Sequence, residues 1–363
     1  MPALFVGLMS GTSLDGIDAV LADGSEPIPR VLAADHAPFD ADLRAQLVEL
    51  HAPAAGELHR AELAAITLAR AYADSVARTL ACAGVEPRAV RAIGCHGQTI
   101  RHRPADGYTV QLVNGAWLAE LTGITTVCDF RSRDLAAGGQ GAPLVPAFHA
   151  QVFRSRDEPR AVVNVGGIAN VTSLALDGAV SGFDCGPGNA LMDGWIAAQR
   201  TEPYDRDGAW AASGRVLPVL LERLRAHPFF AAPPPKSAGR EQFNLEWVRS
   251  LLAGDERPQD VQATLLELTV HGIADAIATQ GPRGCSVWLC GGGARNTALV
   301  SRLAKVLAPQ RVATTAALGV APEHVEALAF AWLAQRTLAG EAGNIPAVTG
   351  ARGPRVLGAI YPA

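Results

Sequence analysis

Lysine is nearly absent from this sequence, which has 31 basic residues but only two lysines, Lys236 and Lys305. A lysine-based phosphate site therefore has almost no candidates. No G-x-x-x-x-G-K-[ST] motif and no protein-kinase motif set occurs either, which excludes a P-loop protein and a protein kinase. The formal net charge of −4 argues against nucleic acid or an anionic membrane surface as the main partner.

Paired cysteines and long apolar runs are also missing. The six cysteines are scattered and none stands in a C-x-x-C pair, so neither structural zinc nor a disulfide framework is indicated. No basic stretch followed by an apolar one marks a secretory signal. The longest uncharged run, residues 135–153, contains three glycines and two prolines, which fits a loop and a helix start better than a membrane span. We expect a cytoplasmic protein.

What is present is an alternation of strands and helices. The 363 residues are 49% hydrophobic and 18% charged, enough for two domains that each have a core. The alternation predicts an α/β fold with parallel pairing in each half, and a long amphipathic helix over 57–83 that Gly84 ends.

A stretch of small residues, "LAAGGQGAPLVPAF", is the best candidate for a crossing between the domains. The predicted N-terminal domain therefore covers 1–140, and the tail 341–363 is expected to return to it. The predicted C-terminal domain covers 141–340.

Each half begins with a strand, a Gly-rich hairpin and another strand, near residues 4–22 and 161–174. Backbone N–H groups in such turns form an anion-binding concavity. A third glycine-rich turn, Gly291 to Gly293, precedes a helix, whose N-terminus favours anions. One turn alone is weak evidence. The three in this order match the acetate and sugar kinase, Hsc70 and actin superfamily, in which two hairpins hold the phosphates of one nucleotide.

Longer motifs make the resemblance specific. The stretches "GLMSGTSLDGIDAV", "CHGQTIRH", "NVGGIANVT", "GFDCGPGNALMDGW", "CGGGARN", "EALAFAWLA" and "NIPAVTGA" resemble the anhydro-N-acetylmuramic acid kinase family, and the match runs from about Phe5 to Pro362. Two departures are Ala238, where a hydroxyl residue is expected, and Cys95, where serine is usual. The first puts a loop contact in doubt.

The resemblance implies a two-domain actin-like ATPase fold with a nucleotide cleft between the domains, ATP and Mg²⁺ as cofactors, and a homodimer. It also implies a role in peptidoglycan recycling. The implied substrate is 1,6-anhydro-N-acetylmuramic acid, whose O6 is locked in an ether bridge to C1. Water must attack C1 while O6 takes the γ-phosphoryl group of ATP, giving N-acetylmuramic acid 6-phosphate and ADP.

Asp184 is the candidate catalytic residue. It stands at a strand end before a Gly-Pro-Gly turn, where a carboxylate could accept the proton of the attacking water. The competing interpretation is that Asp184 merely caps the helix that follows.

The candidate ATP site draws on all three turns. Asp15, an acidic residue beside phosphates, would need a divalent cation between them, directly or through water; an ordinary Asp-Gly hairpin turn is the alternative. The predicted ATP-binding residues are Gly11, Thr12, Ser13, Leu14, Asp15, Gly16, Ile17, Asp18, Gly166, Gly167, Asn170, Gly291, Gly292 and Gly293.

Three residues are candidates for sugar binding. Arg131 could hold the lactyl carboxylate of a muramic acid, because its fork geometry suits a carboxylate, or it could join a surface ion-pair cluster. Glu326 could contact the sugar, or be favoured in a first helical turn by the dipole alone. His96 could bond the substrate or have a structural role.

Two other functions stay open on the sequence alone. One is a kinase of the same superfamily that acts on a sugar with a free hydroxyl group. The other is a nucleotide-binding regulator or chaperone-like ATPase, which the lack of an appended domain and of a DNA-binding helix pair speaks against.

Overall fold

The computed structural model describes residues 2–11, 13–234, 236–239 and 242–363. The chain divides into two compact units, residues 1–152 with 324–363, and residues 153–323. These boundaries differ from the predicted ones, because residues 141–152 and 324–340 lie in the first unit. The tail, as expected, lies in the first unit too.

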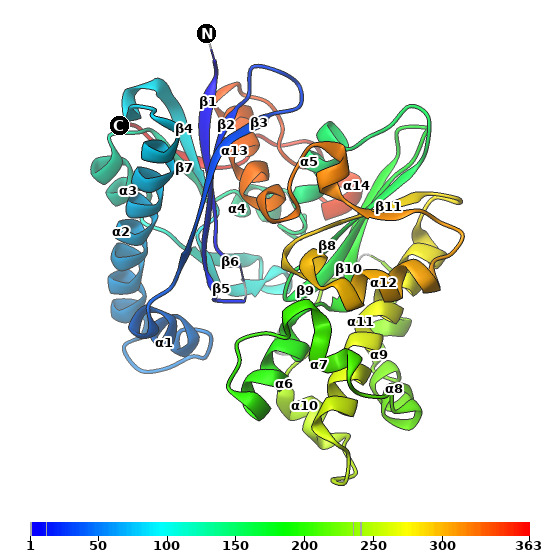
Figure 1. Ribbon diagram of the computed structural model, residues 1–363. Coiled ribbons are helices and arrows are strands. Elements are labelled where there is room, and N and C mark those ends of the chain that lie inside the picture. Colours follow the sequence, from blue (N-terminus) through cyan, green and yellow to red (C-terminus); the bar gives the residue numbers. More distant parts are fainter. Residues whose placement is uncertain (1, 12, 235, 240–241) are drawn as a thin grey trace. The chain divides into compact units, whose positions relative to one another are not determined.

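The first unit contains a six-stranded sheet with the strand order β13-β7-β4-β1-β2-β3 (Figure 1). The strands β1, β2 and β3 pair antiparallel, whereas β4 pairs parallel with both β1 and β7. A separate two-stranded sheet, β5 and β6, was not predicted from the sequence. The strands of this unit are β1 Leu4–Met9, β2 Gly16–Asp23, β3 Arg30–Pro38, β4 Val90–Cys95, β5 Gln98–Arg103, β6 Tyr108–Leu112, β7 Thr126–Cys128 and β13 Ala359–Tyr361.

The helices of the first unit include the long one predicted from the sequence, α2. It spans Glu57–Ala83 and ends at Gly84, whose left-handed backbone (φ 63°) suits glycine. The prediction for this helix is confirmed. The helices are α1 Ala41–Glu49, α2 Glu57–Ala83, α3 Gly115–Thr122, α4 Ser132–Ala136, α5 Val145–Val152, α13 Val325–Leu338 and α14 Pro346–Thr349.

Helix α13 lies directly on β1 and β4, which explains why it belongs to the first unit. Two glycines permit this contact. A Cβ added to Gly7 would lie 1.8 Å from the carbonyl oxygen of Ala327, and one added to Gly94 would lie 2.0 Å from that of Phe330. No side chain fits at either position, so the strand and helix backbones meet through bare glycine.

The second unit repeats the strand pattern of the first. Its sheet has the order β10-β9-β8-β11-β12, in which β10, β9 and β8 pair antiparallel while β11 pairs parallel with β8 and β12. The weak repeat noted in the sequence is thus confirmed, as is the α/β class. The strands are β8 Arg160–Val165, β9 Ile168–Leu174, β10 Val180–Pro187, β11 Ser286–Cys290 and β12 Val312–Thr314.

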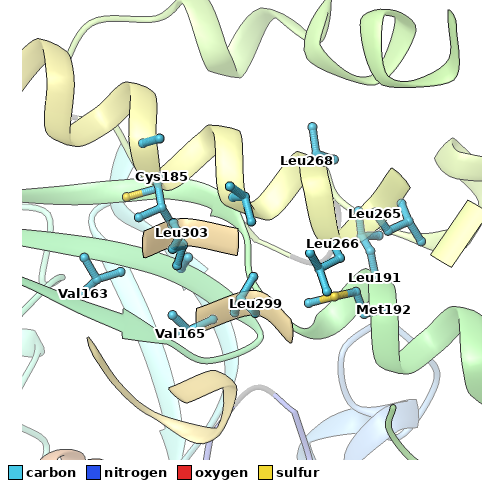
Figure 2. Packing of buried hydrophobic residues seen from close by; sticks show 14 of the residues in the cluster. Val163, Val165, Cys185, Leu191, Met192, Leu265, Leu266, Leu268, Leu299 and Leu303 are labelled. Atoms are coloured by element: carbon cyan, nitrogen blue, oxygen red, sulfur yellow. The ribbon is translucent and has the colours of Figure 1, made fainter. Parts of the chain in front are cut away.

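Helix α11 forms the centre of the second unit's core. Most of its side chains are buried, and Leu265, Leu266 and Leu268 pack in one hydrophobic cluster with residues of the sheet and of other helices (Figure 2). The helices of this unit are α6 Ala190–Arg200, α7 Ala209–Ala212, α8 Pro218–Arg225, α9 Pro228–Ala231, α10 Leu245–Ser250, α11 Pro258–Gln280 and α12 Thr297–Val306. Within the described ranges of the chain, no helix is long and apolar enough to cross a membrane.

Candidate functional site

The first glycine-rich turn joins β1 to β2 and is anchored at its start. The buried hydroxyl of Ser10 lies 2.6 Å from the hydroxyl of Tyr72 and donates to the carbonyl oxygen of Gly97 (3.2 Å). Gln98 donates through Nε2 to the carbonyl oxygen of Gly11 (3.0 Å). These contacts fix the start of the turn through the side-chain hydroxyl of Ser10 and the backbone carbonyl of Gly11.

The predicted ATP-binding residues of this turn differ in burial and in the partners of their side chains. Leu14 is buried with a left-handed backbone (φ 57°), and Ile17 is buried within β2. Asp18 also lies in β2, where its carboxylate is 2.8 Å from Nδ1 of His36. Asp15 is exposed and accepts a hydrogen bond from the hydroxyl of Ser13 (2.6 Å).

Gly16 is the first residue of β2, and Gly11 is half-buried at the other end of the turn. Thr12 lies outside the described residues. Among the described residues of the predicted stretch, Gly11, Ser13, Asp15 and Asp18 are at least partly exposed, whereas Leu14, Gly16 and Ile17 are buried.

The structure brings the other two glycine-rich turns together within the second unit. The carbonyl oxygens of Gly166 and Gly167 accept hydrogen bonds from the backbone N–H groups of residues 188–190, which lead from the Gly-Pro-Gly turn into α6 (2.8 to 3.1 Å). A Cβ on Gly293 would lie 2.3 Å from Val165. The hairpin turn, the Gly-Pro-Gly turn and the glycine triplet thus pack against one another.

Asp184 belongs to a row of polar residues across the sheet of the second unit. In the strand register Asn164 lies opposite Asn170, and Asn170 lies opposite Asp184. Directly opposite residues of antiparallel strands project from the same face, with Cβ atoms about 4.5–5.5 Å apart. Asn164 was not among the residues predicted from the sequence, although its position just before the Gly-Gly turn mirrors that of Asn170 after it.

The backbone around Asp184 excludes the helix-cap interpretation. Helix α6 begins at Ala190, and the residue at its N-cap is Asn189 rather than Asp184. The N–H of Ala190, the first of the helix, is taken by the carbonyl oxygen of Gly167. The register shifts between Asp184 and Gly186, a β-bulge of the kind that redirects side chains near active sites. Asp184 is half-buried at this bulge.

A loop holds the carboxylate of Asp184. The backbone N–H of Ala238 donates to Oδ2 of Asp184 (2.8 Å), and the N–H of Asp184 donates to the carbonyl oxygen of Lys236 (3.2 Å). This contact uses the backbone of residue 238 and so does not depend on a hydroxyl side chain there.

Lys236 anchors this loop. Its ammonium group donates to the carbonyl oxygen of Phe229 (3.1 Å) and lies 4.6 Å from the centre of that residue's ring. Burial lowers the pKa of Lys236.

The three predicted sugar-binding residues lie in the first unit, and two of them, Arg131 and His96, are in direct contact. Arg131 donates to Nε2 of His96 from Nε (3.2 Å) and lies 2.9 Å from it through Nη2, and Nη1 donates to the carbonyl oxygen of Gly141 (2.7 Å). The ring of His96 lies 4.8 Å from that of Phe330. Glu326 is half-buried one turn before Phe330 on α13, so both lie on the same side of the helix.

Burial keeps three histidines of the first unit neutral. It lowers the pKa of His96 to about 3 and that of His102 to about 4, with the positive charge of Arg131 as a second cause in both. Burial alone lowers the pKa of His149 to about 3. A neutral His96 can accept the hydrogen bonds of Arg131, which an imidazolium could not.

These shifts predict acid destabilisation. Below the ordinary histidine pKa of about 6.5 the unfolded chain binds protons that the folded chain does not, so the free energy of unfolding falls with pH until the folded pKa values are reached. Each histidine contributes a slope of about 1.4 kcal/mol per pH unit. His96→Gln is expected to reduce the slope between pH 6 and 4.5 by that amount, measured by urea unfolding at a series of pH values. His149→Gln should reduce the slope by the same amount. An unchanged pH dependence of the free energy of unfolding in both variants would contradict the lowered pKa values of these histidines.

A metal site made only of protein side chains is not evident. Among the residues with a described placement, no three His, Cys, Asp or Glu side chains are grouped to hold a metal ion. Magnesium commonly takes one or two carboxylates, with phosphate oxygens and water completing its shell. The exposed carboxylate of Asp15, within the first turn, fits that donor set.

Comparison with known proteins gives a full-length match. A family model described as "Anhydro-N-acetylmuramic acid kinase" matches residues 3–363. Proteins of that name from Thiobacillus denitrificans and Nitrosomonas europaea are 58% and 55% identical to this chain over 99% of its length, covering 97% and 99% of their own. Among solved structures, a ROK family glucokinase from Streptomyces griseus has a TM-score of 0.41 at 12% identity, over 92% of this chain and 100% of its own.

Proposed function

This chain belongs to the anhydro-N-acetylmuramic acid kinase family, and we propose that Asp184 is the base with which it opens the anhydro ring. The protein is an ATP-dependent kinase of peptidoglycan recycling. The observation that supports Asp184 is its place at a β-bulge, in line with Asn164 and Asn170 and held at Oδ2 by the Ala238 N–H.

Besides a proton transfer, the reaction forms two bonds and breaks two. A water oxygen bonds to C1 of the sugar while the C1–O6 bond breaks, and the freed O6 bonds to the γ-phosphorus of ATP while the bond to the β-phosphate oxygen breaks. The water proton passes to the carboxylate of Asp184, as in an inverting glycosidase. No general acid is required, because phosphorus instead of a proton takes up O6.

ATP binding is proposed to use the backbone of the glycine-rich turns. Gly11, Ser13 and Asp15 of the first unit, and the turns at 166–167 and 291–293 of the second, would each meet part of the nucleotide. Asp15 would hold Mg²⁺, directly or through water. When bound, the ion neutralises charge on the phosphates. ATP as co-substrate agrees with a cytoplasmic location; the homodimer stays a prediction.

The sugar is proposed to be recognised by residues of the first unit. Arg131 would hold the lactyl carboxylate through charge-assisted hydrogen bonds, His96 would keep its guanidinium in place, and Glu326 would contact the sugar. The direct test incubates the protein with ATP, magnesium and 1,6-anhydro-N-acetylmuramic acid and looks for a sugar phosphate by mass. ATP bound without any such product would contradict the function.

Arg131→Ala is expected to raise the KM for the anhydro sugar about 10- to 100-fold, since a hydrogen bond to a charged group contributes about 1.5–3 kcal/mol. The KM for ATP should stay within about twofold of the parent value. Steady-state kinetics with each substrate varied measure both constants. The neighbouring exposed Arg133→Ala is the control. Equal changes in both KM values, or none, would contradict sugar binding by Arg131.

A further inference from the structure

Asp134 is a fully buried carboxylate that the mechanism above does not use. Its exposed fraction is 0%, yet its two oxygens accept hydrogen bonds from groups far apart in the sequence. Oδ2 accepts from the backbone N–H of Gly141 (2.8 Å), and Oδ1 accepts from Nδ2 of Asn344 (2.6 Å) and the hydroxyl of Thr349 (2.8 Å). Burying a carboxylate costs free energy unless hydrogen-bond donors replace the lost water, and these three donors offset that cost.

Gly141 connects this carboxylate to the proposed sugar site. Its N–H is held by Asp134, and its carbonyl oxygen accepts from Nη1 of Arg131. Its backbone is left-handed (φ 68°), a conformation that favours glycine. Asp134 thus holds Gly141 through its N–H, and the carbonyl oxygen of Gly141 in turn holds the guanidinium of Arg131.

The loop between Asp134 and Gly141 packs closely against the carboxylate of Asp134. A Cβ on Gly139 would lie 2.2 Å from Oδ2 of Asp134, the oxygen that holds Gly141. Gly139 also donates its N–H to the backbone carbonyl of Asp134 (2.9 Å). The glycines of "AAGGQGAP" therefore allow the chain to close over this side chain.

The C-terminal motif "NIPAVTGA" completes the arrangement. Asn344 and Thr349 come from its two ends, and the backbone N–H of Gln140 donates to the carbonyl oxygen of Thr349 (2.7 Å). The N–H of Arg352 donates to the carbonyl oxygen of Ala137 (2.9 Å). The tail and the loop 137–141 are thus joined by two backbone hydrogen bonds in addition to the side-chain bonds of Asp134.

We propose that Asp134 is a positioning residue for sugar binding: it fixes Gly141 so that the Gly141 carbonyl and His96 hold the Arg131 guanidinium in a single orientation. This inference rests on the proposed role of Arg131. It gives the C-terminal motif a function as well, since Asn344 and Thr349 keep the buried carboxylate in place.

The test is a double-mutant cycle between Asp134→Asn and Arg131→Ala, with the KM for the anhydro sugar and the KM for ATP as readouts. Asp134→Asn alone is expected to raise the sugar KM about tenfold and to leave the ATP KM within twofold. In the Arg131→Ala background the same change should alter the sugar KM less than twofold, because the positioned group is gone. Asp129→Asn, the same chemical change at an exposed site of this segment, is the control.

Three results would overturn the proposal, each in a recognisable way. An equal rise of the sugar KM in both backgrounds, or a parallel rise of the ATP KM, would show that Asp134 acts on stability alone. A sugar KM that Arg131→Ala leaves unchanged would remove the role of Arg131 and the proposal with it. Should Asp134→Asn not fold, Gly139→Ala displaces the same oxygen and keeps the charge, and it is expected to give the same dependence on Arg131.

Discussion

Replacing Asp184 by asparagine is expected to lower kcat about 10³-fold while ATP binding is kept. General-base catalysis contributes about 10²–10⁴-fold, and an amide cannot take up the proton of the attacking water. Asparagine has nearly the same shape, and its Oδ1 can still accept from the N–H of Ala238, so the loop contact should survive. The measurement is turnover of the anhydro sugar together with calorimetric ATP binding.

Asp177→Asn is a matched control for this variant. Asp177 lies exposed in the turn before β10 and accepts a backbone N–H from Ala179 (2.9 Å), as Asp184 does from Ala238. Its replacement should leave kcat within twofold. A kcat for Asp184→Asn within tenfold of the parent value would rule out the base, whereas loss of ATP binding would indicate a structural role.

Gly7→Ala is expected to cost about 3 kcal/mol or more of the free energy of unfolding. The added Cβ would lie 1.8 Å from the carbonyl oxygen of Ala327 and 2.8 Å from the backbone N of Ala331, so α13 must move off β1. Overpacking a core costs about 1–3 kcal/mol when side chains can shift, and here only backbone faces the new methyl group. The denaturant midpoint measures the loss.

The control is Gly353→Ala, where the nearest atom is the end of the Arg355 side chain at 3.2 Å. A flexible side chain can move away, so the free energy of unfolding should change by less than about 0.5 kcal/mol. If Gly7→Ala is as stable as Gly353→Ala, the close contact between β1 and α13 is wrong.

The sequence predicted those features that local chemistry determines. Glycines between apolar runs indicate the two hairpins, Gly11 and Gly16 in the first and the pair Gly166-Gly167 in the second. The periodicity of 57–83 and Gly84 indicate α2. Asp184 could be singled out because a carboxylate stands before a Gly-Pro-Gly turn. Its β-bulge could not, because a register shift depends on the strand alongside.

Contacts between distant segments could not be predicted from the sequence either. Nothing near Asp134 indicates that Asn344 and Thr349 will meet it, and nothing in α13 alone indicates that it packs on Gly7 rather than within the second unit. The domain boundaries were misplaced for this reason. Asn164 was missed because its place beside Asn170 follows from strand pairing.

The most direct test of the account follows the oxygen that enters the sugar. The protein is mixed with ATP, magnesium and 1,6-anhydro-N-acetylmuramic acid in oxygen-18 water, and the product is weighed before anomeric exchange can occur. Water attack at C1 predicts N-acetylmuramic acid 6-phosphate with one heavy oxygen at C1 from the first turnover. A sugar phosphate without it, or heavy oxygen only in free phosphate, would contradict ring opening coupled to phosphoryl transfer.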